Sequence, residues 1–188
     1  MKNHTWILGS KSPRRSELLA GIGCAFEVRT KDTPENYPKE LALEKVPEYL
    51  ATVKANALLE DLQENEVVIC ADTVVIINNE ILGKPENEAE AKMMLQKLSA
   101  NTHTVITGVF VGNKTKQIIF SDSTKVTFSK LTNSEIDFYI EQFKPFDKAG
   151  SYGIQEWIGF IGVKAIEGSY TNVMGLPTNK LYHVLIYF

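Results

Sequence analysis

The chain has 188 residues, of which 44% are hydrophobic and 23% are charged, and its formal net charge at pH 7 is −3. These values exclude a disordered chain, and the negative charge argues against a protein that binds nucleic acid through bulk electrostatics. No Pro/Ser/Gly-rich stretch or run of like charges marks a linker, so we expect residues 1–188 to form one domain whose size also allows two small lobes.

Hydrophobic periodicity and turn residues predict the following elements in chain order. The chain opens with a strand at residues 5–8 and a helix that begins at Pro13, after Ser12 as N-cap, and ends at Gly21 or Gly23. Further strands are expected at residues 25–30, 67–71, 74–77, 103–111, 117–128, 160–166 and 170–174. Further helices are expected from Glu48, after Asn87, after Thr132 and after Pro177.

Turn and cap signals support this order. Asn78-Asn79 suits a tight hairpin turn, while Asn87 and Thr132 are each followed by a glutamate three residues later, which is typical of a capping box. The mixture of hairpins and helices predicts an α/β fold with a mixed, twisted sheet flanked by helices, not a purely parallel sheet.

The longest apolar run, residues 67–77, is interrupted by Asp72 and Thr73, and the apolar part of the N-terminus is too short for a signal peptide. We therefore expect a cytoplasmic protein that makes no membrane contact. Cys24 and Cys70 have no Cys or His nearby in sequence, which favours core thiols in a reducing compartment over a zinc site or a disulfide. His103 has no adjacent nucleophile and is expected to be a strand histidine with ordinary hydrogen bonds.

Residues 9–15 place two hydroxyls and three cations where the first helix begins. Free backbone N–H groups and the helix dipole favour an anion there, and the guanidinium groups of Arg14 and Arg15 match phosphate oxygens. Because cations oppose the dipole at this end, a bound anion explains them better than chance placement. An ordinary N-cap at Ser12 with a solvated basic first turn stays open as the alternative.

Asp72 follows the buried run 67–71. A carboxylate at the end of a buried strand needs a metal, a cation or hydrogen-bond donors, because leaving it unpaired costs several kcal/mol. A structural aspartate that binds loop amides is the alternative.

Two lysines and one loop complete the candidates. Lys54 lies in an apolar helical stripe and Lys84 in a Gly-Lys-Pro turn, and each lysine alone is better explained as a solvated side chain. In the loop at residues 147–155, two glycines allow a ligand close to the backbone, and Gln155 can donate and accept toward a base edge, although a purely structural loop explains them equally well. Glu35 follows Pro34 in a predicted loop, where a glutamate side chain is more often solvated than functional.

Seven short segments, in order over nearly the whole chain, together resemble the Maf family of nucleoside triphosphate pyrophosphatases. They are Ser10-x-Ser12-Pro13-Arg14-Arg15, Lys54-Ala55, Ala71-Asp72-Thr73-Val74-Val75, Gly83-Lys84-Pro85, His103-x-Val105-x-Thr107-Gly108, Asp147-Lys148-Ala149-Gly150-x-Tyr152-Gly153-Ile154-Gln155 and Gly168-Ser169-Tyr170-x-Asn172-Val173-x-Gly175-Leu176-Pro177. Single motifs of this length are weak, but seven in order make a chance resemblance improbable.

The resemblance implies a Maf/ITPase-like fold of two lobes with a central substrate cleft, dependence on Mg²⁺ or Mn²⁺, and often a homodimer. It also implies hydrolysis of a nucleoside triphosphate to the monophosphate and pyrophosphate. The form of the loop that ends in Gln155 resembles the branch that acts on dTTP and UTP, and modified pyrimidine nucleotides stay open as substrates.

The resemblance also carries roles onto matching positions. Asp72 is implied as the acid or base, Asp72 and Glu35 as metal or water partners, and Arg14, Lys54 and Lys84 as phosphate contacts. Base selection is implied for Arg14, Thr73 and Gln155. The expected catalytic set is Asp72, Glu35, Lys54 and Lys84, and the expected substrate-binding set is Ser10, Ser12, Arg14, Arg15, Thr73 and Gln155.

Three positions depart from the usual family pattern. Gly9 stands where Ala is common, and Ala100 stands where Gly is usual; both are small-residue exchanges of little chemical content. Pro34 replaces an often acidic neighbour of Glu35 and removes one potential metal ligand.

Two other functions compete with hydrolysis to pyrophosphate. A regulator of cell division could sense a nucleotide without turnover, and another phosphohydrolase could remove the terminal phosphate alone. Asp72 together with Lys54 and Lys84 favours an enzyme, because phosphate binding by itself does not need a carboxylate in an anion site.

Overall fold

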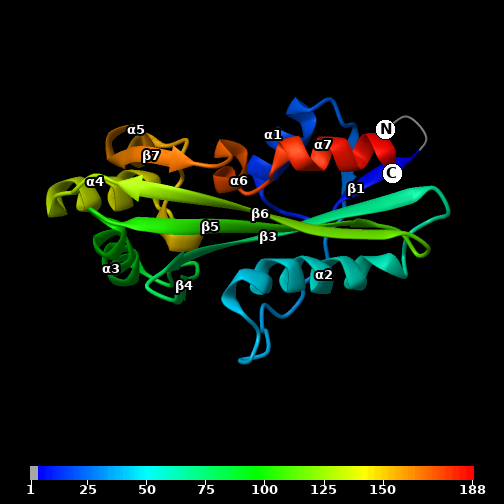
Figure 1. Cartoon of the computed structure of the whole chain (residues 1–188), viewed down its shortest axis with the longest axis horizontal. Coiled ribbons are helices and arrows are strands. Elements are labelled where there is room, and N and C mark those ends of the chain that lie inside the picture. The colour runs from blue at the N-terminus through cyan, green and yellow to red at the C-terminus, as the bar shows by residue number, and fades with distance from the viewer. Residues whose placement is uncertain (1–3) are drawn as a thin grey trace. The chain divides into compact units, whose positions relative to one another are not determined.

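The computed structural model describes residues 4–188. The strands are β1 (Thr5–Leu8), β2 (Phe26–Val28), β3 (Glu66–Ile77), β4 (Glu80–Leu82), β5 (Thr102–Gly112), β6 (Gln117–Phe128) and β7 (Val163–Glu167) (Figure 1). The α-helices are α1 (Pro13–Gly21), α2 (Val46–Leu59), α3 (Glu88–Leu98), α4 (Asn133–Phe143), α5 (Trp157–Gly162), α6 (Tyr170–Met174) and α7 (Thr178–Tyr187). Two single turns of 3₁₀ helix are η1 (Leu43–Lys45) and η2 (Ala149–Ser151). None of the helices in residues 4–188 combines the length and apolarity that a membrane span requires.

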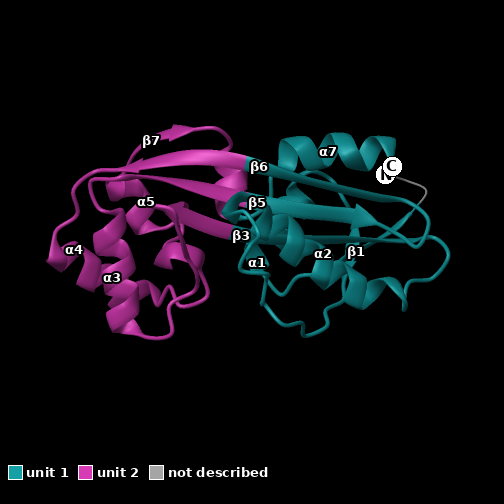
Figure 2. Cartoon of the chain, turned by 60° about the horizontal axis from the view of Figure 1, so that its bottom comes forward, with its two compact units in different colours: residues 1–73, 107–122, 175–188 teal, residues 74–106, 123–174 magenta. Residues whose placement is uncertain are grey.

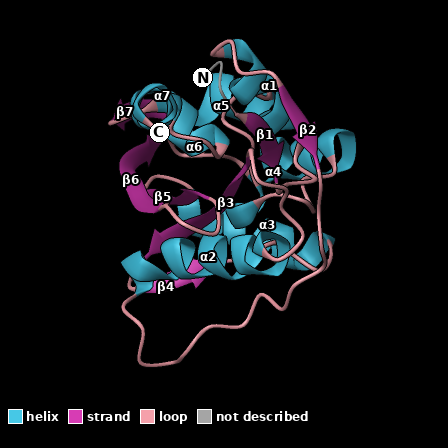
Figure 3. Cartoon of the chain, turned by 90° about the vertical axis from the view of Figure 1, so that its right-hand side faces the viewer, coloured by secondary structure: helices cyan, strands magenta, loops and turns pink. Residues whose placement is uncertain are grey.

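The strands form one seven-stranded sheet in the order β2-β1-β3-β5-β6-β7, with β4 paired to β3. β1 is parallel to both β2 and β3, whereas β4 is antiparallel to β3 and β7 is antiparallel to β6. Helices flank this mixed sheet, as the sequence predicts (Figure 3).

The chain divides into two compact units, coloured separately in Figure 2. Unit 1 comprises the chain up to Thr73 together with Thr107–Asp122 and Gly175–Phe188, and unit 2 comprises Val74–Ile106 and Ser123–Met174. Three of the four boundaries fall within β3, β5 and β6, so these strands contribute residues to both units, and the fourth follows α6. Each unit is described by itself below.

The core of unit 1 follows the two-residue alternation of its strands. In β1, Trp6 and Leu8 pack with α1 and α7, whereas Ile7 packs with α2. In β3, Val67, Ile69 and Ala71 join the first group, and Val68 and Cys70 join the second. Figure 1 shows α2 on the opposite side of these strands from α1 and α7. Both faces of the strands in unit 1 are therefore apolar and covered, which explains the nearly continuous hydrophobic run in β3.

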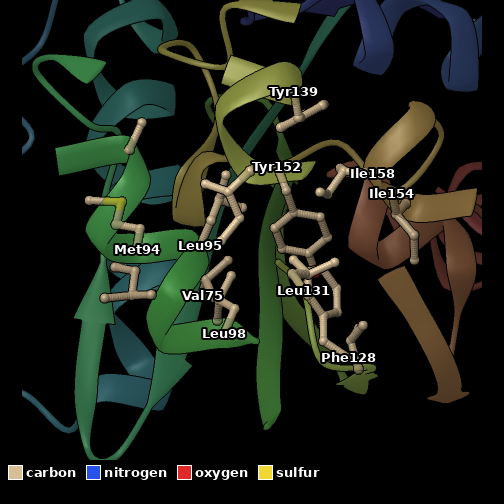
Figure 4. Packing of buried hydrophobic residues seen from close by; sticks show 14 of the residues in the cluster. Val75, Met94, Leu95, Leu98, Phe128, Leu131, Tyr139, Tyr152, Ile154 and Ile158 are labelled. Carbon is tan, nitrogen blue, oxygen red and sulfur yellow. The ribbon is translucent and has the colours of Figure 1, made fainter. Parts of the chain in front are cut away.

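The core of unit 2 packs α3, α4 and α5 against the remaining parts of β3, β5 and β6 (Figure 4). Tyr139 and Tyr152 are both buried in this cluster. The Tyr152 ring meets Phe128 and His103 edge to face, with centroid distances of 5.0 and 5.4 Å. Such pairs are the favoured geometry for buried aromatic rings.

Local turn and cap signals are largely confirmed. Asn78 and Asn79 have φ of 51° and 60° between β3 and β4, the left-handed pair that a two-residue hairpin requires. Thr132 forms the complete capping box of α4. Asn87 caps α3 by accepting from Glu90 N–H, but the Glu90 carboxylate accepts from the N–H of the residue before Asn87, so that box is only half formed.

Two expected strands need correction. The strand expected at residues 160–166 is present as β7 but begins only at Val163, because Phe160 belongs to α5, where Ile158 and Gly162 are buried while Phe160 is exposed, a helical and not an alternating pattern. The strand expected at residues 170–174 is wrong. Residues 170–174 form α6, and the Ser169 hydroxyl accepts from Asn172 N–H three residues on, as an N-cap does.

A third correction concerns β3. This strand runs without interruption from Glu66 to Ile77, so Asp72 lies inside it and not at the end of a shorter strand. The expected break at Asp72 and Thr73 does not occur, because both residues keep their places in the strand and their side chains find partners on its two faces.

Candidate functional site

The first constellation surrounds Arg15 in unit 1. Its guanidinium Nε–H donates to the Gly175 carbonyl at 2.9 Å, while Nη1 donates to Ser10 Oγ at 3.3 Å and Nη2 to Thr73 Oγ1 at 3.1 Å. Burial lowers the pKa of Arg15, and the nearby Asp72 carboxylate opposes that shift. Arg15 is therefore not a solvated cation of the first helical turn but a half-buried hub that joins three segments.

Ser10 and Ser12 take different parts at the start of α1. Ser12 is the N-cap, but its side chain makes no capping hydrogen bond. Ser10 Oγ accepts from Ser12 N–H at 3.2 Å and from Arg15, so both of its lone pairs are used. The hydroxyl proton of Ser10 is consequently left as the donor of this group.

The second constellation consists of two carboxylates that accept hydrogen bonds from the same ammonium group. Lys54 Nζ of α2 donates to Asp72 Oδ1 and, at 3.2 Å, to Glu35 Oε1. The side chains of Lys54 and Asp72 are only 19% and 13% exposed, whereas that of Glu35 is 51% exposed. A lysine that looks like a snorkelling side chain in the sequence is thus the shared partner of both acidic candidates.

Strand alternation explains why adjacent residues serve different constellations. Cys70 packs on the α2 side of β3, so Asp72 points to the same side and meets Lys54 there. Thr73 points to the opposite side, where its hydroxyl meets Arg15 and lies 2.9 Å from that of Thr107.

Arg14 and Glu35 also act on this region electrostatically. Both are close enough to change the pKa of Arg15, Arg14 by lowering it and Glu35 by raising it. Unit 1 thus holds eight of the ten candidates, namely Ser10, Ser12, Arg14, Arg15, Glu35, Lys54, Asp72 and Thr73.

The remaining candidates, Lys84 and Gln155, belong to unit 2. Lys84 is exposed in the turn after β4, and the neighbouring Gly83 carbonyl accepts from Gly150 N–H at 3.0 Å. That bond ties the lysine turn to the loop that carries Gln155. Within the described chain, Gln155 Oε1 is buried and has no hydrogen-bond partner.

The predictions for His103 and for the two cysteines can be compared with the structure. His103 Nε2 lies 2.7 Å from the Tyr152 hydroxyl, and burial lowers the pKa of the imidazole to about 4. The hydrogen bond confirms the expected strand histidine. Cys24 and Cys70 are buried free thiols, and burial raises the pKa of Cys70 to about 12.

Sequence reasoning did not single out Thr107 and Gly175 as parts of the site. Thr107 supplies a fully buried hydroxyl, and Gly175 supplies a carbonyl 160 positions away from Arg15. The residue type at Gly175 does not indicate that its backbone carbonyl is an acceptor, although Thr107 and Gly175 both lie within the motifs quoted above.

The carboxylate pair fits a divalent cation of the magnesium type. Within residues 4–188, no group of three or more His, Cys, Asp or Glu side chains is arranged to hold a metal by itself. Mg²⁺ is usually bound through one or two carboxylates plus water and substrate phosphates, and Asp72 and Glu35 converge on one point, the Lys54 ammonium. These two residues suit such an ion, and they offer no closed, all-protein site.

Comparison with known proteins shows which family and which relatives this chain is similar to. The family of Maf-like proteins matches residues 5–188. A protein of Phocaeicola vulgatus named dTTP/UTP pyrophosphatase is 51% identical over 97% of this chain and 95% of its own length. A protein of the same name from Porphyromonas gingivalis is 50% identical over 98% of this chain and 94% of its own length.

Solved structures show the same fold at low identity. The Ham1 protein of Staphylococcus aureus has a TM-score of 0.57 and 16% identity, covering 97% of this chain and 98% of its own. A HAM1 protein of Coxiella burnetii has a TM-score of 0.54 and 12% identity, covering 98% of this chain and 100% of its own. The fold is thus shared with Ham1 proteins, and from the family match over residues 5–188 and identities near one half, the chain belongs to the Maf family.

Proposed function

We propose that this protein hydrolyses dTTP and UTP to the monophosphate and pyrophosphate. The observation that carries the proposal is the Lys54 ammonium shared by Asp72 and Glu35 beside Arg15, because it joins phosphate-binding cations to carboxylates that can act on water or metal. The relatives named dTTP/UTP pyrophosphatase support the choice of substrate.

The cations of unit 1 are assigned to the triphosphate. Arg15 already donates hydrogen bonds to three neighbours, so its role is to hold Ser10 and Thr73 in place as well as to supply charge. The Ser10 hydroxyl proton can then be donated to a phosphate oxygen, and Arg14 adds a planar guanidinium. Lys54 pairs with both carboxylates and is expected to turn toward phosphate when nucleotide binds.

Charge balance supports a requirement for Mg²⁺ or Mn²⁺. Arg14, Arg15 and Lys54 contribute three positive charges, and Asp72 and Glu35 contribute two negative charges, so this cluster carries a net charge of +1 and cannot by itself balance a polyphosphate. Asp72 and Glu35 would hold the divalent ion, which supplies positive charge to the phosphates and lowers the pKa of water.

Asp72 is assigned to the attacking water. Lys54 fixes the orientation of its carboxylate, and in-line attack depends mainly on a positioned water and a neutralised phosphate. Glu35, being more exposed than Asp72, is better suited to assist in metal binding. Lys84 is assigned to the phosphates by its place in the family motif.

Gln155 is assigned to the base. Its buried Oε1 needs a hydrogen-bond donor, and thymine and uracil both present an N–H at the centre of their pairing edge. Cytosine presents a lone pair at that position, which would face the amide oxygen unfavourably. The amide oxygen therefore favours dTTP and UTP over dCTP and CTP.

We further infer a cytoplasmic, single-domain enzyme that acts on free nucleotides. The net charge of −3 and the two buried free thiols support this location. Both features are compatible with a small-molecule substrate. A homodimer stays a prediction from the family resemblance.

A panel of eight ribo- and deoxyribonucleoside triphosphates tests the proposal, with separate assays for pyrophosphate and orthophosphate. We expect Mg²⁺-dependent pyrophosphate from dTTP and UTP, with little from cytidine and purine nucleotides. Orthophosphate as the sole product would instead support removal of the terminal phosphate. Tight binding with no product would support a nucleotide sensor.

A further inference from the structure

The loop before Gln155 is held by a hydrogen-bond network from α4. The Tyr139 hydroxyl accepts from Gly153 N–H at 3.0 Å and donates to Glu156 Oε2. These two loop residues flank Gln155 in the sequence. One fully buried hydroxyl therefore contacts the chain on both sides of the residue assigned to the base.

The donor and acceptor roles in this network are fixed. Burial, and then the contact with Glu156, raise the pKa of Tyr139 well above its ordinary value, so the phenol keeps its proton. The proton serves Glu156, and an oxygen lone pair serves Gly153 N–H. Tyr139 cannot exchange these roles, because an N–H donates only and a carboxylate oxygen here only accepts.

Lys148 completes the network from the other end of the loop. Its ammonium lies 3.1 Å from Glu156 Oε1 and 2.8 Å from Asp147 Oδ1, and its side chain is only 9% exposed. The Glu156 carboxylate is thus bound on one oxygen by Tyr139 and on the other by Lys148. This arrangement closes the loop on itself, since residues 148 and 156 lie near its two ends.

Gly153 provides the room for that carboxylate. A Cβ at Gly153 would lie 2.7 Å from the Glu156 carboxyl carbon and 2.9 Å from Oε2. The φ of Gly153 is not in the left-handed region, so backbone conformation does not demand glycine here. The demand comes from the close approach of the carboxylate.

From these contacts we infer that Tyr139 and Glu156 are positioning residues that hold Gln155 for selection of the base. The inference rests on the proposed function, in which Gln155 reads a pyrimidine. The Glu156 N–H donates to the Gly153 carbonyl at 3.0 Å, which closes the turn around Gln155. A buried amide oxygen without a partner is costly to hold, and a rigid turn keeps it in place until a ligand N–H satisfies it.

The test compares Tyr139→Phe with Tyr152→Phe. Both remove one hydroxyl from a buried tyrosine of the same core cluster (Figure 4), but the Tyr152 hydroxyl bonds to His103 and not to the turn. The measurement is kcat/KM for pyrophosphate release from dTTP and from dCTP. In Tyr139→Phe we expect the ratio to fall about 10-fold, which corresponds to about 1.4 kcal/mol, mainly through a higher KM for dTTP. Tyr152→Phe should keep the wild-type ratio.

Three further variants separate positioning from simple loss of stability. Glu156→Gln keeps an acceptor for Tyr139 and should retain most of the selectivity that Glu156→Ala loses. Gly153→Ala displaces the carboxylate while leaving Tyr139 and Glu156 in the chain, and should lower the dTTP/dCTP ratio as Tyr139→Phe does. Melting temperatures of all variants show whether each one folds.

Calorimetric binding of dTTP and dCTP in EDTA distinguishes the inference from the proposed function. If the wild type prefers dTTP in binding but releases no pyrophosphate, the proposed activity fails while the variants still test positioning. An unchanged preference in folded Tyr139→Phe and Gly153→Ala, or an equal loss in Tyr152→Phe, would overturn the inference.

Discussion

Replacing Asp72 by Asn removes one negative charge from the cluster with Lys54 and Glu35 while it keeps the size of the side chain and an oxygen that can accept from Lys54. If Asp72 activates water or holds a metal, turnover should fall by at least the ~10²-fold typical of lost general acid–base catalysis. If Asp72 only caps local structure, the amide should substitute and activity should survive.

The effect on stability should be small for a reason visible in the structure. Lys54 keeps Glu35 as a partner at 3.2 Å, so the substitution does not leave a buried ammonium without a counterion. We therefore expect the free energy of unfolding to change by about 1 kcal/mol or less, well below the ~3–5 kcal/mol of a fully buried pair broken on one side. For a chain of this length, that change corresponds to a shift of about 2–4 °C in Tm.

The assay is steady-state pyrophosphate release from dTTP at saturating Mg²⁺, with Tm measured on the same samples. Asp122→Asn is the matched control, because Asp122 is also a strand aspartate of unit 1, is 18% exposed, and is paired with a lysine, Lys180, at 2.6 Å. The control should retain activity. Near-normal turnover of Asp72→Asn, or an equal loss in the control, would refute the assignment.

Three other predictions concern α1, the buried histidine and a close glycine contact. Arg14→Ala should lower kcat/KM by the equivalent of about 1.5–3 kcal/mol. Arg15→Lys, which cannot reproduce three divergent donors, should lower both activity and the free energy of unfolding, and the loss of stability should exceed that of Arg14→Ala; equal stability of the two variants would contradict the hub. His103 has a pKa of about 4, below its ordinary 6.5, so its contribution to stability is complete above pH 6.5 and falls by up to about 3 kcal/mol as the pH drops toward 4; urea unfolding should show this loss, and His103→Phe should lack it. A Cβ at Gly9 would lie 2.3 Å from Cys70 Sγ, so Gly9→Ala should destabilise by about 1–3 kcal/mol and Cys70→Ala should relieve part of that cost; additive effects in thermal unfolding would disprove the contact.

Local signals predicted most of the fold. The paired asparagines before β4 and the box at Thr132 mark their turns through side-chain chemistry that acts within four residues. The sequence gives little sign of α5, because Gly159 and Gly162 have low helix propensity. Glycine is needed at position 159 because a Cβ there would lie 1.8 Å from the Ile154 carbonyl oxygen. The segment that forms α6 resembles a strand in composition, because Tyr170 is aromatic and Thr171 and Val173 are β-branched, although Tyr170, Val173 and Met174 stand at helical spacing.

The candidate site was predictable as a set of residues but not as a set of contacts. The sequence indicates that Asp72 needs a partner, yet only the face to which β3 directs it identifies Lys54. Arg14 and Arg15 are equivalent in the motif, and helix geometry alone decides that Arg15 reaches Thr73. The small exchange at Gly9 also proves to have structural content, since Cys70 fills the space that an alanine would need.

The most direct test of the central claim is ³¹P NMR of wild-type protein with dTTP, followed in Mg²⁺ and then in EDTA. The account predicts that dTMP and pyrophosphate appear together in equal amounts, that no dTDP accumulates, and that EDTA stops the reaction. Formation of dTDP with orthophosphate, or undiminished hydrolysis in EDTA, would contradict it.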